Sequence, residues 1–316
     1  MAVRFLRDRA CPADGASGVQ PDALSLAGRV LAVLPVLACA PAAAPPVAPP
    51  KVAVLVTVPI GAWQRDWIRR HGGAVDASVA VRYVQTATSF GDLRIRADRP
   101  EVSPAMSLAE LSDDQLAHLA RQSGFAGFTT VEGDSATWHH EIDFQPASDE
   151  PDIGRIEPAG VGRMFEHALD GSYVESWSVL PRGTAGGGSF AARVERSGRV
   201  DQLLAVAGEH FVYARARAVP LPPGASLAEL IERTRPSRET LLTYLDCELS
   251  FGTTWGWQIE RSTLPWLQGQ RLAVAARIGL DASGAPMARV PMPGEHWSFP
   301  VASLAPAELR ALFPAP

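Results

Sequence analysis

The sequence predicts an all-β protein with a few short helices, arranged as two antiparallel β-barrel halves. Apolar, β-branched runs of strand length recur from residue 51 onward at intervals of about 8–12 residues, with glycine, proline and aspartate turns between them. The few helical patterns do not alternate with the strands, which argues against a parallel α/β sheet. The third observation behind the prediction is an internal repeat.

The string Ser-Leu-Ala-Glu-Leu stands at 107–111 and again at 226–230. A tryptophan follows each string at the same distance, and several other positions match at nearly the same offset: Trp138 with Trp257, Glu141 with Glu260, Glu175 with Glu295, and Trp177 with Trp297. Solenoid repeats typically span only about 20–50 residues, so a repeat of this length indicates a duplicated domain. We expect the first half at 51–182 and the second at 183–316.

Residues 1–50 differ in composition from the rest of the chain. Residues 40–50 form a proline- and alanine-rich spacer, and the apolar run before it is too short to span a bilayer. The segment is either a disordered extension of a cytoplasmic protein or a signal. In the second case the run Val36–Cys39 resembles a lipoprotein cleavage site, and Cys39 would anchor a periplasmic lipoprotein. The length and the aspartates of the preceding segment favour the first alternative.

In the first half the runs predict strands at 51–58, 63–70, 79–86, 90–96, 125–132, 136–145, 161–168 and 172–180. His71–Ala74 has the composition of a hairpin turn. Ser107 and Glu110 form a capping box, and an apolar stripe with helical spacing follows: Leu108, Leu111, Leu116 and Leu119. The sequence therefore predicts one helix in this half.

In the second half we expect strands at 188–196, 200–207, 210–217, 243–251, 255–263, 271–279 and 295–301. Ser226 and Glu229 repeat the capping box, and 303–309 is typical of a short terminal helix. Cys247 alternates with Leu249 and Phe251, which predicts a buried, unreactive thiol.

Several classes of function are disfavoured by the sequence. The net charge is −5 and no basic cluster is present, so a nucleic-acid surface is not indicated. The three cysteines lack the spacing of a metal site, and the acidic loop 146–155 lacks the ligand pattern of an EF-hand. Phosphate-binding and hydrolase motifs are absent from the sequence. We therefore expect no cofactor and no metal.

The strand around His140 contains the first candidate site. Strict alternation places Trp138, His140, Ile142 and Phe144 on one apolar face, which should line the barrel lumen. A histidine there would bind a ligand or transfer a proton. The alternative is a core histidine that is satisfied by one hydrogen bond.

Tyr173, Glu175 and Trp177 share a face by the same rule. They suggest a carboxylate in the lumen with a raised pKa, and with His140 it would form an acid–base pair. The alternative is a structural device, because the second half repeats the pair as Glu295 and Trp297.

The strand Phe90–Arg96 carries a polar face formed by Asp92, Arg94 and Arg96. We expect this face on the outside of the barrel, because alternating charged residues usually contact solvent. Arg94 would then bridge the halves through one of three acids: Asp246, Glu248 or Glu260. The functional alternative is an arginine clamp for an acidic ligand.

A resemblance to a known family rests on short motifs: Trp63-Gln-Arg65, Arg82-Tyr-Val-Gln85, Asp92-Leu-Arg94, Trp138 to Asp143, Asp152-Ile-Gly154, Tyr173 to Trp177, and Ser262 to Trp266. With them the chain resembles an uncharacterised bacterial family, similar in pattern to a little-characterised group of yeast proteins built from two lipocalin-like β-barrels. The resemblance implies two lipocalin-like barrels here. It implies no catalytic residue, and this chain has His140 where we expect arginine in the family.

Together these patterns predict binding of a small, partly apolar or acidic molecule in a barrel lumen lined by tryptophans. The ligand-binding residues would be Trp138, His140, Tyr173, Glu175 and Trp177, with Trp257 in the second lumen. One alternative is a scaffold or interaction protein with filled barrels. Another is a cofactor-free proton-transfer enzyme, isomerase or dehydratase that uses His140 and Glu175. Function should lie where the repeats differ: His140 against Ile259, Ile142 against Arg261, and the acidic loop around Asp152.

Overall fold

The computed structural model describes residues 58–102, 104–183 and 188–314. The N-terminal extension with Cys39, and the predicted strand at 51–58 apart from Val58, lie outside these residues. Within them the protein is mostly β, as the sequence predicts. No helix in these ranges combines the length and the apolarity that crossing a membrane requires.

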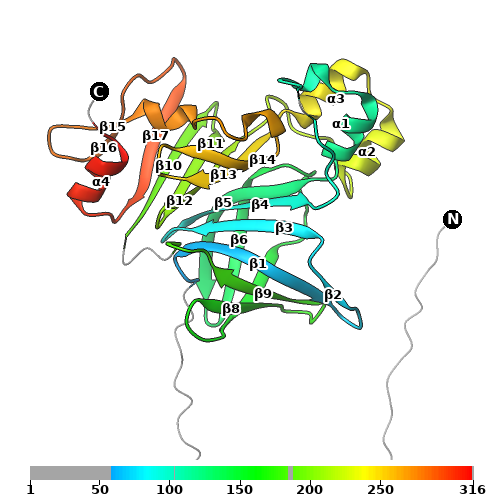
Figure 1. Ribbon diagram of the computed structural model, residues 1–316, viewed down its shortest axis with the longest axis horizontal. Coiled ribbons are helices and arrows are strands. Elements are labelled where there is room, and N and C mark those ends of the chain that lie inside the picture. Colours follow the sequence, from blue (N-terminus) through cyan, green and yellow to red (C-terminus); the bar gives the residue numbers. More distant parts are fainter. Residues whose placement is uncertain (1–57, 103, 184–187, 315–316) are drawn as a thin grey trace, which may run out of the picture. The chain divides into compact units, whose positions relative to one another are not determined.

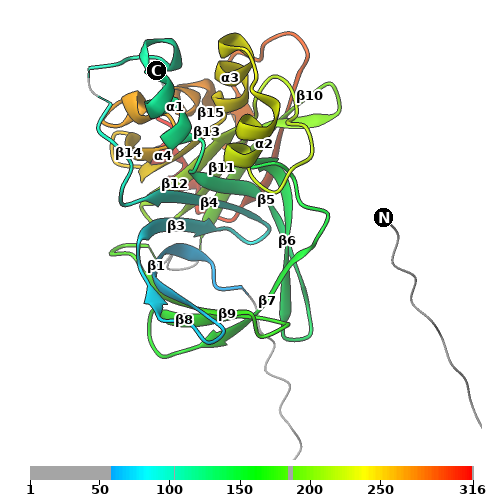
Figure 2. The same cartoon turned by 90° about the vertical axis from the view of Figure 1, so that its right-hand side faces the viewer.

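The first half contains a closed antiparallel barrel of eight strands (Figures 1 and 2). The strands follow one another around the barrel in this order: β1 (Gly61–Arg70), β3 (Val79–Gln85), β4 (Ser89–Arg96), β5 (Ser123–Glu132), β6 (Ser135–Asp143), β7 (Asp152–Pro158), β8 (Arg163–Ala168) and β9 (Tyr173–Val179). Pairing of β9 with β1 closes the barrel, and the short β2 (Val75–Asp76) pairs with the end of β1. A closed barrel leaves no unpaired edge that could template aggregation.

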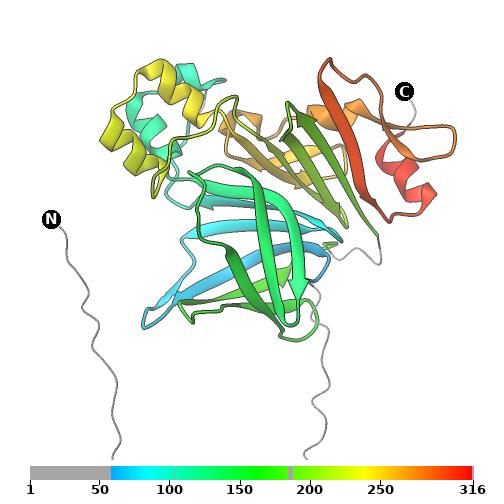
Figure 3. The same cartoon turned by 180° about the vertical axis from the view of Figure 1, so that it is seen from behind.

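The second half contains a six-stranded antiparallel sheet, visible in Figure 3. Its strand order is β14 (Gln258–Ser262), β13 (Glu248–Thr253), β12 (His210–Arg215), β11 (Arg199–Ala207), β10 (Ser189–Arg196) and β17 (Glu295–Ala302). The outer strands β14 and β17 do not pair with each other in the described ranges, so a second closed barrel is not confirmed. A separate hairpin joins β15 (Ile278–Leu280) to β16 (Pro286–Ala288).

The helices are short: α1 (Asp113–Leu119), α2 (Leu227–Thr234), α3 (Arg238–Leu245) and α4 (Pro306–Leu312). Ser226 caps α2 as predicted, because its side chain accepts a hydrogen bond from the Glu229 amide. The cap of α1 is Ser112, which forms a reciprocal box with Gln115, while Ser107 precedes a 3₁₀ turn at Leu108–Glu110. The predicted stripe of four leucines is buried nevertheless.

Three predicted elements differ from the structure. The start of the predicted strand 243–251 belongs to α3, and residues 273–277 of the predicted strand 271–279 form a 3₁₀ helix before β15. The acidic loop is shorter than expected because β7 already begins at Asp152. Short apolar runs match both the helical and the strand period, so only their packing decides between them.

One face of the second sheet packs against the outer wall of the barrel (Figure 1). Leu203, Val212 and Leu249 of the sheet belong to the same buried cluster as Leu93 and other barrel residues. The approach is close at Gly91, where an added Cβ would lie 2.4 Å from Val212 Cγ1. The outer wall of the barrel is therefore apolar on this side.

The other face of the sheet is covered by the C-terminal segment. Trp257 donates a hydrogen bond from Nε1 to the Leu312 carbonyl at 3.2 Å, and its ring stacks on Phe313. Trp257 is thus buried beneath α4, and the prediction that it lines a lumen is wrong.

Candidate functional site

A β-bulge in β6 overturns the predicted alternation around His140. Gly127 pairs with His140 and Ala126 pairs with Ile142, so Glu141 is an extra residue between them. An extra residue reverses the side to which the following side chains point. Trp138 therefore lies in the barrel cluster, while Ile142 joins the cluster against the second sheet. The expectation that these two share a face is wrong.

His140 lies between two carboxylates. Its Nδ1 is 2.7 Å from Asp143 and its Nε2 is 3.1 Å from Asp152, and the ring stacks on Phe125. Burial opposes the charged ring, but the hydrogen bonds and charges of both aspartates outweigh it and raise the pKa of His140 to about 9. The protonated ring donates to both carboxylates and links β6 to β7. It has no free lone pair at neutral pH with which to act as a base.

Glu175 is buried inside the barrel, where it forms an ion pair with Arg65. It lies directly opposite Glu166 on β8. The Glu166 carboxylate accepts a hydrogen bond from the Tyr173 hydroxyl at 2.9 Å. Burial, followed by the charges of Glu175 and Asp152, raises the pKa of Glu166 to about 8. The carboxyl group that retains a proton at neutral pH is therefore Glu166, which the sequence patterns did not single out.

Trp138 and Trp177 are both buried in the barrel and meet at Tyr83. Trp138 Nε1 donates to the Tyr83 hydroxyl at 3.0 Å, and the rings of Tyr83 and Trp177 are 5.8 Å apart. Of the five predicted ligand-binding residues, Trp138, Tyr173, Glu175 and Trp177 thus contact one interior network. His140 and Glu175 have different partners, so they do not form the predicted acid–base pair.

Asp92 and Arg94 face the barrel interior, contrary to the prediction that they lie outside. Arg94 Nε is 2.8 Å from Asp92 Oδ1, and the guanidinium lies over the Phe125 ring. The predicted bridge from Arg94 to the second half is wrong, since Arg215 pairs with two of the expected acids, Asp246 and Glu248. The reason is that the second sheet buries the outer wall, which directs the apolar face of β4 outward.

These side chains leave little space in the barrel. The cavity bounded by Tyr83, Asp92, Trp138, Glu166 and Trp177 has a volume of about 20 Å³. That volume is comparable with the space that one water molecule needs.

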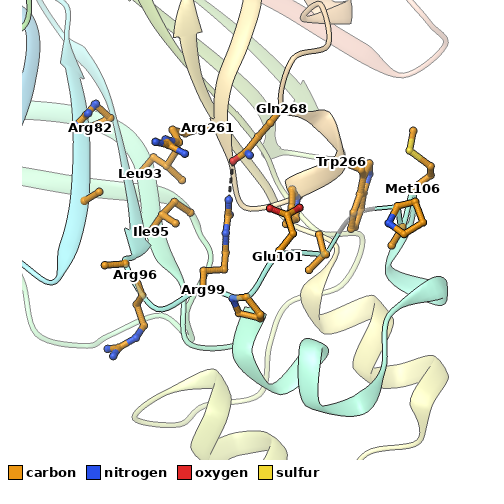
Figure 4. Close-up of a pocket in the computed structure, with 17 residues that line it drawn as sticks. Arg82, Leu93, Ile95, Arg96, Arg99, Glu101, Met106, Arg261, Trp266 and Gln268 are labelled. Carbon is orange, nitrogen blue, oxygen red and sulfur yellow. Dashed lines mark hydrogen bonds between the residues drawn. The ribbon is translucent and has the colours of Figure 1, made fainter.

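A much larger groove lies outside the barrel. It has a volume of about 680 Å³ and lies between β3 and β4, the segment that follows β4, and the segment from β14 to the turn Pro265–Leu267 (Figure 4). Its described lining residues include four arginines and a single carboxylate: Arg82, Arg96, Arg99, Arg261 and Glu101. Trp266, Met106 and Ile95 contribute apolar surface. Figure 4 shows Arg82 and Arg261 at one end and Trp266 and Met106 at the other.

Two of the four arginines each donate two or more hydrogen bonds to other residues of the protein. Arg96 donates two hydrogen bonds, of 2.8 and 2.9 Å, to the carboxylate of Asp98. Arg99 donates to Gln122 Oε1, the Ser262 carbonyl and Gln268 Oε1 at 2.6–2.8 Å. Arg99 therefore ties the segment after β4 to the segment after β14, and it holds the two walls of the groove together.

The other two arginines have no carboxylate partner among the described residues. Arg82 donates one hydrogen bond to the Val81 carbonyl and lies 5.9 Å from the centre of the Phe251 ring. Arg261 is exposed and makes neither an ion pair nor a hydrogen bond with a described residue. Burial and the charge of Arg261 lower the pKa of Arg82, although the charge of Glu260 opposes this. The same two effects lower the pKa of Arg99, opposed by Glu101.

Sequence reasoning missed most of this groove. Arg82 and Arg261 belong to different halves, and no local pattern links them. One signal was present in the sequence: the two repeats differ here, because the second has Arg261 where the first has Ile142. That isoleucine is buried against the second sheet, whereas the arginine lines the groove.

Comparisons with protein-family models and with curated protein sequences gave no match. Among solved structures, the fold is distantly similar to that of an uncharacterized protein from Saccharomyces cerevisiae, with a TM-score of 0.45 and 12% sequence identity. The similarity covers 77% of this chain and 98% of the yeast chain. Membership of a family of tandem lipocalin-like barrels stays a prediction.

Proposed function

We propose that the protein binds a small anionic, partly apolar molecule in the groove lined by Arg82 and Arg261. The observation that carries the proposal is that these two arginines face about 680 Å³ of space without a carboxylate partner among the described residues. Half-buried charges such as that of Arg82 are normally paired, and the exposed Arg261 lies near it, so the two together favour an anion from outside the protein.

The remaining lining suits an organic anion better than a bare inorganic ion. Met106 is 60% exposed, and it lies with Trp266 at the end of the groove away from Arg82. Small-molecule sites typically combine apolar and aromatic walls with a few polar groups that fix the orientation of the ligand. A ligand with an acidic group at the arginines and an apolar group against Trp266 would find favourable contacts at both ends of the groove.

The barrel lumen is the alternative location for a ligand, and its five predicted residues stay a prediction. A ligand larger than a water molecule would have to displace the network around Tyr83 and Glu166, because the cavity there measures about 20 Å³. We infer that Trp138, Tyr173, Glu175 and Trp177 act as a rigid interior. The barrel would then serve as the support for the groove.

We also propose that the two halves arose by duplication. The hairpins β5–β6 and β13–β14 carry the same kind of bulge, with Glu141 and Glu260 as the extra residues. In each hairpin a glycine lies at the bulge, and an added Cβ on Gly127 or Gly252 would come within 1.9 Å of a carbonyl oxygen across the pair. In this interpretation the binding groove arose where Arg261 replaced the counterpart of Ile142.

A direct test is a calorimetric titration with benzenesulfonate, a flat apolar ring that carries a permanent negative charge. The full chain should bind it saturably, and Arg261→Ile should weaken binding by about tenfold or more, because one charge-assisted contact is lost. Arg199→Gln is the matched control, since it removes an exposed arginine on β11 outside this groove. Binding that is insensitive to Arg261→Ile but lost in Trp138→Phe would place the ligand in the lumen and overturn the proposal.

A further inference from the structure

We infer that the groove selects a doubly charged oxyanion, of the kind carried by a phosphate monoester, which is held between the guanidinium groups of Arg82 and Arg261. This inference rests on the proposed function and adds to it the charge of the ligand. It follows from the number of free cationic groups, their mutual repulsion and the rigidity of the walls that carry them.

The first argument is the number of free donors. Arg96 and Arg99 use their guanidinium groups on Asp98 and on three protein oxygens, respectively. Arg82 uses one donor nitrogen on the Val81 carbonyl, and Arg261 makes no contact of this kind with a described residue. A guanidinium offers five N–H donors in a planar fork. Two guanidinium groups with most of their N–H donors free match the three oxygens of a phosphate better than the two oxygens of a carboxylate.

The second argument is electrostatic. Burial is the main cause that lowers the pKa of both Arg82 and Arg99, and the positive charge of Arg261 lowers each of them further. The described residues that line the groove include four arginines and one carboxylate, so positive charge is in excess there. A doubly charged anion between the two guanidinium groups would offset more of this positive charge than a singly charged anion at the same place.

The third argument is preorganisation. Arg82 projects from β3, one of the strands of the closed barrel. Arg261 projects from β14, and the neighbouring strand β13 packs in the core against the barrel. Arg99 links the two walls through its hydrogen bonds to the Ser262 carbonyl and to Gln268, and Figure 4 shows the bond to Gln268. Because the two strands are fixed before binding, the ligand has to order only the arginine side chains, and this favours selection by geometry and charge.

The test compares phenyl phosphate with benzenesulfonate, which has the same ring but only one negative charge. At pH 7.5 the full chain should bind phenyl phosphate about tenfold more tightly. The advantage should disappear at pH 5, because the second pKa of a phosphate monoester is near 6 and the ligand becomes a monoanion. No histidine is among the described lining residues, and arginine side chains are protonated at both pH values.

Arg82→Gln and Arg261→Gln should each remove the preference, so that the two ligands bind with similar affinity. Arg199→Gln should retain it, and an unchanged melting temperature would show that the variants are folded. Equal binding of both ligands by the native protein would overturn the inference while the proposed function stands. Absence of binding by either ligand would overturn both. A phosphate preference that survives both arginine substitutions would also overturn the inference, because the dianion would then bind elsewhere.

Discussion

Glu166 and Glu175 lie directly opposite each other on β8 and β9, with both side chains inside the barrel. Arg65 pairs with Glu175, and the Tyr173 hydroxyl donates to Glu166. Two buried carboxylates at adjacent positions repel when both are ionised, so one of them retains a proton. Burial, followed by the charges of Glu175 and Asp152, raises the pKa of Glu166 to about 8, so Glu166 is the one that retains it at neutral pH.

The proton on Glu166 predicts a pH-dependent stability. The pKa of Glu166 is about 8 in the folded chain and 4.5 for an ordinary glutamate, so the folded protein holds a proton over this range that the unfolded chain releases. The free energy of unfolding should therefore fall as pH rises from about 4.5 to 8. Glu166→Gln should flatten this slope and exceed the native protein in stability at pH 8 by about 1–3 kcal/mol.

Urea unfolding followed by circular dichroism at several pH values measures the slope. Glu132→Gln on β5 is the matched control, because this glutamate is exposed. If the free energy of unfolding depends on pH in the same way in Glu166→Gln and in the native protein, another group holds the proton.

His140 should stabilise the protein only while it is protonated. Its pKa of about 9 exceeds the ordinary 6.5, so its contribution is fully present below pH 6.5 and is lost as pH rises through 9. His140→Gln should lower the free energy of unfolding at pH 6 by about 1–3 kcal/mol, with a much smaller effect at pH 10. A proton NMR titration of the ring measures the pKa directly.

His139 provides the control for that experiment. It contacts Thr130 and stacks on Phe128, and no acid is among its contacts in the described ranges. His139→Gln should change the stability by less than about 0.5 kcal/mol at either pH. An ordinary ring pKa for His140 would contradict the arrangement of Asp143 and Asp152 around it.

Arg99 should matter more for stability than its half-buried position indicates. Arg99→Gln removes three hydrogen bonds, two of which reach the distant residues Ser262 and Gln268, and this should cost about 2–4 kcal/mol. Arg99→Lys keeps the charge but loses the planar fork, so it should restore less than half of the loss. Arg96→Gln, which breaks an exposed pair with Asp98, should cost under about 1 kcal/mol. Chemical denaturation of the three variants tests this ranking, and equal costs would contradict it.

The two bulges should tolerate no side chain at their glycines. A Cβ on Gly127 would lie 1.9 Å from the His139 carbonyl, and one on Gly252 would lie 1.9 Å from that of Gln258. Each alanine substitution should therefore cost about 3 kcal/mol or more in thermal or chemical unfolding. Gly224→Ala is the control, since its nearest neighbour would be 3.5 Å away. Costs near zero at both bulges would mean that the strands pair without them.

Much of the local structure follows from the sequence. The positions of most strands, the Ser226 cap and the leucine stripe of the first half agree with it, because each depends on a few neighbouring residues. Cys247 is buried as expected, and burial raises the pKa of its thiol to about 11. The missed helix α3 shows the limit, since an apolar run of this length fits either period until its packing is known.

Tertiary structure decided which strand face lies inside. Alternation divides the residues of β4 into two sets, but it cannot tell which set faces the lumen. The second sheet covers the outer wall, so Leu93 points outward and Asp92 inward, opposite to the expectation from solvent exposure. The bulge at Glu141 similarly depends on the pairing of β6 with β5, which a single strand does not specify.

The groove depends entirely on long-range packing. Arg82 belongs to the barrel and Arg261 to the second sheet, so only the contact between the two brings their charges together. By itself, the sequence determined that the chain folds into mostly β structure with a repeated pattern, because those properties depend on local periodicity. The tertiary structure decided that Arg82 and Arg261 come together in a groove outside the barrel, because their proximity depends on how the two halves pack.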